Sequence, residues 1–205
     1  MTAGSTLETV SVTEAARLAA DHLERRPLLV CSDFDGTLSQ IVQDPWAAAI
    51  LPLGRQALRR LAGTPGVCVA VLSGRTAADV AARVRVGNVT YLGNHGMERG
   101  YLPRGGRPER LLTTSVPVDP VVAAAADRLA GEVAACVDEP WLVVERKPPA
   151  VAFHYRQAPD VVAAAKRVLA VVDELDAAEQ LERFAGRRVL ELRPPGAVAK
   201  GEAFR

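Results

Sequence analysis

The segment that most limits how this chain can fold runs from Leu28 to Leu38. It begins as an apolar run of strand length and ends in Asp33, Asp35 and a glycine. Alternate residues of a strand share a face, so both carboxylates are predicted to point beyond its carboxyl end, where open α/β sheets bind ligands. Two like charges so close repel each other. This favours a hard cation such as Mg²⁺, or a division of roles in which one carboxyl keeps its proton and acts as an acid.

Composition excludes several classes of function. The chain has 205 residues, enough for one large or two small domains, and a formal net charge of +1. That charge gives no electrostatic case for nucleic acid or an anionic membrane, and no uncharged apolar run reaches the roughly 18 residues of a membrane span. The N-terminus lacks a signal-peptide pattern, and Cys31, Cys68 and Cys136 are widely separated. We therefore expect a cytoplasmic monomer with reduced thiols.

Strands and helices alternate in the first half of the chain. A helical segment is predicted over 1–27, a helix over 54–62 and a buried strand over 67–72. Another helix is predicted to start at Thr76 and a third strand to cover 89–92. This alternation is typical of a doubly wound parallel sheet.

The element order changes after a Gly/Pro/Arg segment at 103–108. From there the pattern predicts helix, two strands, helix, two strands, which is an α+β layer. We expect this layer to be an inserted cap. The predicted division is an N-terminal helical segment 1–27, a core 28–104, a cap 105–187 and a return to the core over 188–205.

Polar side chains follow three strands of the predicted core: Asp33 and Asp35, then Ser73 with Gly74, then residues 93–96. The carboxyl ends of parallel strands meet in one crevice. There, one carboxylate can attack phosphorus while a second transfers protons, and Ser73, helix-start amides and Lys200 can hold phosphoryl oxygens. Taken alone, Ser73-Gly74 is more typical of a plain strand-to-helix turn than of a functional site.

Several motifs carry a family resemblance. Residues 33–38 resemble the first motif of the haloacid dehalogenase superfamily, and 72–75 resemble its second motif in the form used by trehalose-6-phosphate phosphatases. The similarity continues through 93–98, 145–147, 154–156, 189–194 and 200–201, and so covers residues 28–205. It implies a doubly wound (Rossmann-like) α/β core of the haloacid dehalogenase type with an inserted α+β cap. It also implies Mg²⁺-dependent hydrolysis of a small-molecule sugar phosphate, trehalose 6-phosphate, through an aspartyl-phosphate intermediate.

The resemblance assigns a role to each matching position. Asp33 is implied to be the nucleophile and a Mg²⁺ ligand, and Asp35 the general acid/base, whose backbone carbonyl is also implied to bind the metal. Phosphate binding falls to Ser73, Gly74 and Lys200. Substrate contacts are implied for Arg75, Asn94, His95, Glu145, Lys147, Arg156 and Glu191.

Alternative interpretations stay open for some of these residues. Glu145 and Lys147 could form a surface ion pair of small value, and His95 could be a structural histidine. Trp46 and Trp141 are predicted to be packing residues.

The chain departs from the family pattern after Lys200. The family's fourth motif, a glycine followed by acidic residues that complete the Mg²⁺ site, does not occur before Arg205. We therefore expect a truncated chain that binds Mg²⁺ weakly and turns over slowly. Two alternatives are a phosphatase for another sugar phosphate and a non-catalytic sugar-phosphate-binding protein.

Overall fold

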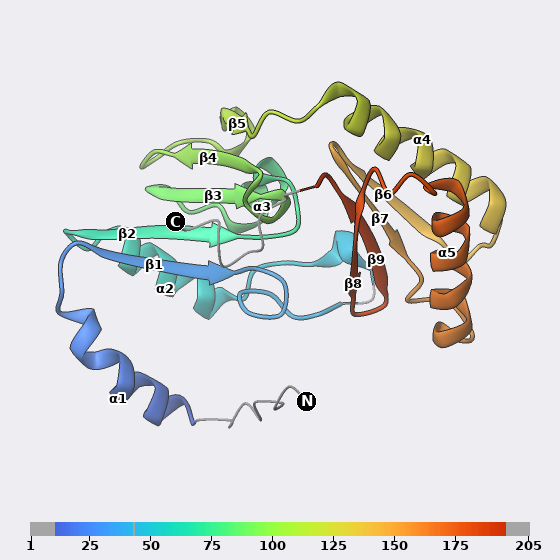
Figure 1. The fold of residues 1–205 in the computed structure, drawn as a ribbon. Helices are drawn as coiled ribbons and strands as arrows, with labels where there is room; N and C mark the ends of the chain where they lie inside the picture. Colours follow the sequence, from blue (N-terminus) through green and yellow to red (C-terminus); the bar gives the residue numbers. More distant parts are fainter. Residues whose placement is uncertain (1–10, 43, 196–205) are drawn as a thin grey trace, which may run out of the picture.

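The computed structural model describes residues 11–42 and 44–195, so Lys200 lies outside the described residues. Two sheets lie side by side, each with its own helices and hydrophobic cluster (Figure 1). Before the first sheet, α1 (Val12–Leu23) forms the helix predicted in the N-terminal segment. No helix in the described part of the chain is long and apolar enough to cross a membrane.

The first sheet has the strand order β1-β2-β3-β4-β5. Its strands are β1 (Leu28–Asp33), β2 (Val67–Leu72), β3 (Val89–Gly93), β4 (Glu98–Leu102) and β5 (Thr113–Ser115). The first three are parallel and are joined by α2 (Pro52–Ala62) and α3 (Ala77–Val84), whereas β4 and β5 add antiparallel pairs. The predicted α/β class with a parallel core is confirmed.

Residue alternation along β2 divides the first sheet into two faces. Val67, Val69 and Val71 are buried in one cluster with the apolar residues of α2 and α3. On the other face Cys68 and Ala70 line a hollow of about 660 Å³. The three cysteines of the chain are unpaired and exposed.

The second sheet is antiparallel, with the strand order β6-β7-β9-β8. Its strands are β6 (Val143–Lys147), β7 (Ala150–His154), β8 (Glu182–Gly186) and β9 (Val189–Arg193). Phe153, Leu190 and Leu192 are buried against α4 (Pro120–Val137) and α5 (Val161–Leu175), which cover one face. The other face lies toward the carboxyl ends of β1, β2 and β3 (Figure 1).

The structure corrects two predicted boundaries. Strand β5 pairs with β4, so the first sheet extends past residue 104, and the Gly/Pro segment is part of the β4–β5 connection with the short η3 helix (Pro108–Arg110). The boundary at 187/188 falls inside the β8–β9 hairpin, and both of these strands belong to the second sheet. Trp141 packs in the second cluster as predicted, but Trp46, in the η1 turn (Pro45–Ala47), is 63% exposed.

Candidate active site

A tight turn after β1 places the second carboxylate. The strand ends at Asp33, and the carbonyl of the fully buried Phe34 accepts hydrogen bonds from the amides of Leu38 and Ser39 at 3.0 and 2.9 Å. Gly36 adopts φ +88°, a left-handed conformation that glycine tolerates at little cost. Strand alternation was therefore the wrong reason for the position of Asp35, because this turn sets it. The Asp35 side chain is 43% exposed and lines a pocket.

Arg75 holds the Asp35 carboxylate from the loop after β2. Its Nη2 lies 2.9 Å from Oδ1 of Asp35 and its Nε 3.1 Å from Oδ2, a fork that suits a carboxylate. Asp79 accepts from Nη1 at 3.3 Å, and the Ser73 hydroxyl donates to Asp35 at 3.4 Å. Burial alone would lower the pKa of Arg75, but its bonds to Asp35 and its interaction with Asp79 raise it. Arg75 is thus a partner of Asp35 rather than a free substrate-binding group.

The loop after β3 packs directly on the loop after β2. The Asn94 and His95 amides donate to the carbonyls of Arg75 and Ser73 at 2.8 and 3.0 Å. A Cβ on Gly74 would lie 2.8 Å from the His95 ring, so only glycine permits this approach without a shift. The two loops therefore form one rigid layer beneath the pocket.

Asn94 was predicted to contact substrate, but the structure places it elsewhere. Its side chain is buried and donates to Glu98 at 2.6 Å. Glu98 in turn accepts from the Ala77 amide at 2.8 Å at the start of α3. Asn94 therefore supports the helix that carries Asp79.

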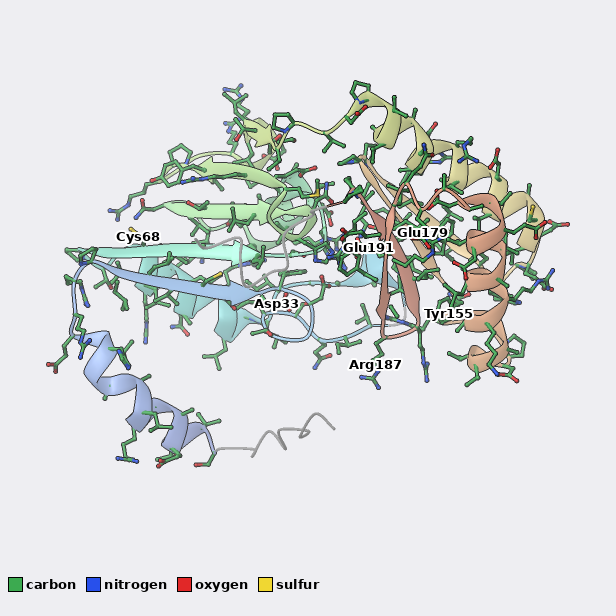
Figure 2. All side chains as sticks on the ribbon, viewed as in Figure 1. Asp33, Cys68, Tyr155, Glu179, Arg187 and Glu191 are labelled. Carbon is green, nitrogen blue, oxygen red and sulfur yellow. The ribbon has the colours of Figure 1, made fainter. Side chains whose placement is uncertain are left out.

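Three buried charged groups of the second sheet meet the half-buried His95 of the first sheet and so join the two sheets. Glu191 accepts from the Lys147 ammonium at 2.7 Å and from Arg193 at 2.7 Å, and lies 3.0 Å from the His95 ring (Figure 2 labels Glu191 on β9). Lys147 also donates to the Gly74 carbonyl at 3.2 Å. The alternative of an exposed surface pair for Lys147 is wrong, because its side chain is only 8% exposed.

Burial and neighbouring charges set the protonation of this cluster. Burial would raise the pKa of Glu191, but hydrogen bonds from His95 and Lys147 and their positive charges hold it well below its usual range. Burial lowers the pKa of His95, and the cations Arg193 and Lys147 add to that shift against the effect of Glu191. Glu191 is therefore ionised near neutral pH, where the lowered pKa of His95 favours its neutral form; the positive charge of His95 acts on Glu191 only at lower pH, where the imidazole is protonated.

A small residue leaves room between two acidic ones. Ala152 on β7 lies in register with Glu145 on β6 and with Glu191 on β9. Glu145 is also bonded to His154 at 2.8 Å, and this bond, with the charge of Lys147, lowers its pKa against the effect of burial. The pocket above Ala152 has a volume of about 350 Å³.

This pocket, called the main pocket below, brings together most of the predicted site. Eight predicted residues line it: Asp35, Gly74, Arg75, His95, Glu145, Lys147, Arg156 and Glu191. Six lining residues were not among the predicted site residues: Ile41, Val42, Ala152, His154, Arg187 and Val189. Asp33 and Ser73 lie at the strand ends beside it (Figure 2 labels Asp33).

Comparison with known proteins identifies the family. The sequence profile described as Trehalose-phosphatase matches residues 31–205. The chain belongs to the trehalose-phosphatase family.

Two curated relatives of this trehalose-phosphatase chain are each 42% identical to it over most of its length. Trehalose-phosphate phosphatase of Mycobacterium avium is 42% identical over 189 residues, which are 90% of this chain and 45% of that protein. An uncharacterized glycosyl hydrolase of Mycobacterium tuberculosis is 42% identical over 181 residues, which are 88% of this chain and 13% of that protein. The chain thus spans less than half the length of these curated relatives.

A solved trehalose-phosphatase structure has the same fold. The C-terminal domain of C. albicans trehalose-6-phosphate phosphatase aligns with a TM-score of 0.76 and 26% identity, covering 95% of this chain and 66% of that one. The fold of the haloacid dehalogenase type that the motifs predicted is confirmed.

The oxygen donors of this trehalose-phosphatase chain fit Mg²⁺. Asp33 offers a hard carboxylate oxygen at the end of β1, and the turn after it offers the backbone carbonyl of Asp35, whose carboxylate is held by Arg75. Within residues 11–42 and 44–195, no group of three or more His, Cys, Asp or Glu side chains could hold a metal. One carboxylate and one carbonyl oxygen match the way Mg²⁺ binds when phosphate and water supply its remaining ligands.

Proposed function

We propose that this chain hydrolyses trehalose 6-phosphate to trehalose and phosphate, as a step of trehalose biosynthesis. The observation that carries the proposal is the main pocket, where the Asp35 carboxylate held by Arg75 faces the Glu145–Ala152–Glu191 row of the second sheet. A carboxylate that can transfer protons therefore lies opposite a polar surface that suits a polyhydroxylated ligand. Family membership supports the same substrate.

The residues of the first sheet would divide the reaction between them. Asp33 attacks phosphorus, and the bond between phosphorus and the sugar oxygen breaks as the aspartyl phosphate forms. Asp35 gives its proton to the departing sugar oxygen and then takes one from the water that hydrolyses the aspartyl phosphate. Ser73, Gly74 and Lys200 would bind the phosphoryl oxygens.

Mg²⁺ would be held by the Asp33 carboxylate and the backbone carbonyl of Asp35. When bound, it would supply positive charge that offsets the negative charge of the phosphoryl group. The protein residues would then orient the phosphorus toward Asp33.

The second sheet and its helices would act as a cap that closes over the sugar. Carboxylates of Glu145 and Glu191 accept hydrogen bonds from hydroxyls, and Lys147 donates them. His95 and Arg156 would complete the contacts. A monomeric, cytoplasmic protein that binds neither nucleic acid nor membrane is part of the same proposal.

The test is phosphate release from trehalose 6-phosphate by the 205-residue chain, with Mg²⁺ and with EDTA. We expect release with Mg²⁺ only, and a loss of about 10³-fold or more in Asp33→Asn, since removal of a nucleophile has effects of that order. Asp138→Asn, an exposed substitution after α4 in a left-handed conformation that asparagine tolerates, is the matched control and should keep its rate.

Three outcomes would contradict parts of the proposal. A full rate in Asp33→Asn would exclude Asp33 as nucleophile. Equal rates on sucrose 6-phosphate and glucose 6-phosphate would exclude the trehalose assignment. Tight binding of trehalose 6-phosphate with no phosphate release would favour the non-catalytic alternative.

A further inference from the structure

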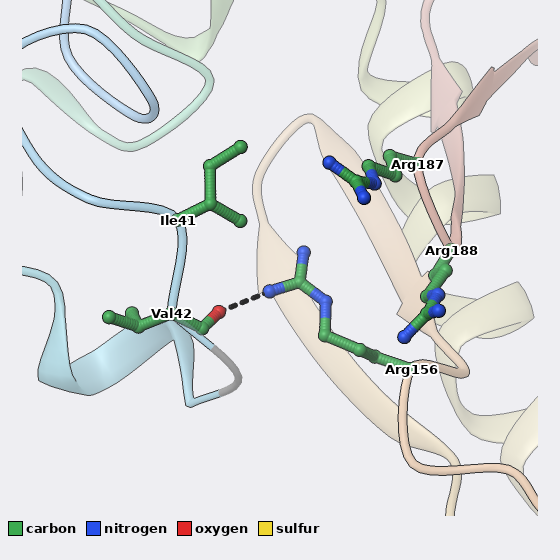
Figure 3. Close-up of a pocket in the computed structure, with 5 residues that line it drawn as sticks. All are labelled: Ile41, Val42, Arg156, Arg187 and Arg188. Carbon is green, nitrogen blue, oxygen red and sulfur yellow. Dashed lines mark hydrogen bonds between the residues drawn. The ribbon is translucent and has the colours of Figure 1, made fainter.

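A second hollow opens beside the main pocket. It has a volume of about 230 Å³ and lies between the chain at Ile41–Val42 and the β8–β9 turn (Figure 3). Its lining consists of Ile41, Val42, Arg156, Arg187 and Arg188, and we call it the arginine annex. All of these except Arg188 also line the main pocket, so the two hollows adjoin each other.

The backbone fixes the three arginines relative to one another. Arg187 and Arg188 form the two-residue turn between β8 and β9, where Gly186 pairs with Val189. The Tyr155 amide donates to the Arg188 carbonyl at 3.2 Å, which brings the following residue, Arg156, beside the turn. The annex is therefore formed by two tethered loops.

The charges of the arginine annex are unbalanced. No carboxylate lines it, and within residues 11–42 and 44–195 the exposed side chains of Arg187 and Arg188 have no hydrogen-bond or ion-pair partner. Arg156 donates to the carbonyl of Val42, a neutral acceptor (Figure 3). Guanidinium groups that converge on one space repel each other unless an anion lies between them.

The chemistry of guanidinium selects the anion. Arginine presents a planar fork of donors that matches the oxygens of a phosphate, and it stays charged at all physiological pH values. The annex volume suits a small group of that kind. Its apolar wall of Ile41 offers no competing charge.

We propose that the arginine annex is an outer anion subsite that binds a phosphate dianion, either free phosphate or the phosphate of a monoester, at the entrance to the main pocket. Anion binding here does not depend on the reaction. The role in drawing substrate inward rests on the proposed function. In that role the subsite raises the local concentration of sugar phosphate beside Asp35.

The first experiment is calorimetric titration of the full chain with inorganic phosphate at low salt. Arg187→Gln/Arg188→Gln should lose one class of bound phosphate or weaken it about tenfold, and 0.5 M NaCl should remove the difference from wild type. The matched control is Arg59→Gln/Arg60→Gln, another adjacent exposed pair on α2, which should bind phosphate as wild type does. Identical isotherms for all three proteins would overturn the subsite.

The second experiment distinguishes the two sources of phosphate and isolates the proposed function. With trehalose 6-phosphate, the Arg187/Arg188 variant should show a kcat/KM about fivefold to tenfold lower at low salt, converging with wild type at high salt, as expected for electrostatic steering. Weakened inhibition by inorganic phosphate with unchanged kcat/KM would assign the subsite to free phosphate. A chain that releases no phosphate but loses phosphate binding in the variant would overturn the proposed function and support the subsite.

Discussion

Lys147→Met tests the cluster that joins the two sheets. Lys147 and Glu191 are about 8% and 10% exposed at the side chain and lie 2.7 Å apart, so the change leaves a carboxylate buried without its main partner. Breaking a buried pair costs about 3–5 kcal/mol, but Arg193 remains 2.7 Å from the other oxygen and should recover part of this. We expect a loss of about 2–3 kcal/mol in the free energy of unfolding. At the size of this chain this is a fall of roughly 5–10 °C in Tm.

Urea and thermal unfolding measure this loss. Lys166→Met, the same substitution at an exposed position of α5, should change the free energy of unfolding by less than about 0.5 kcal/mol. The double variant Lys147→Met/Glu191→Met should lose less stability than the sum of the two single losses, because both single changes break the same contact, although Arg193 then lacks its carboxylate. Equal effects of the two lysine substitutions, or additive losses in the double variant, would refute the reasoning.

Three further predictions concern the pocket and its pH dependence. Arg75→Lys should lower kcat about tenfold or more with little change in KM, because lysine cannot form the two parallel hydrogen bonds that Arg75 makes with Asp35. Steady-state kinetics measure this, and an unchanged kcat would contradict it. Ala152→Leu should raise KM for the sugar phosphate about tenfold by filling the floor of the main pocket, whereas Ala135→Leu, on the exposed surface of α4, should leave KM unchanged. The pKa of His95 is lower in the folded chain than in the unfolded chain, so the unfolded chain binds more protons at mildly acidic pH, and the free energy of unfolding should fall as pH drops through about 6.5. Urea unfolding from pH 7.5 to 5 should show this fall, and His95→Gln should make it smaller.

Site residues could be predicted from the sequence where a polar side chain directly follows an apolar run of strand length. Asp35 and Arg75 follow apolar runs of strand length, and both line the main pocket. Ala152 could not be found in this way. A small apolar residue in a strand carries no chemical signal, and its importance comes from its register with neighbouring strands.

Other differences between the predicted and the observed structure come from strand pairing, which the local sequence pattern does not encode. Strand β4 contains Glu98, Arg99 and Gly100, which disfavour a strand when judged alone, yet it pairs with β3 along its whole length. The contact of Lys147 with Glu191 depends on β9 lying beside β7, a pairing between distant segments. Lys200 was predicted to bind phosphate, and it remains a prediction because it lies outside the described residues.

The strand order of the second sheet has a consequence for synthesis on the ribosome. Strand β9 lies between β7 and β8, although it is the last of the four strands in the chain. The nascent chain therefore cannot complete this sheet until residue 193 has left the exit tunnel. Until then Lys147 lacks the Glu191 carboxylate and one edge of β7 is unpaired, and an unpaired strand edge favours aggregation of the growing chain.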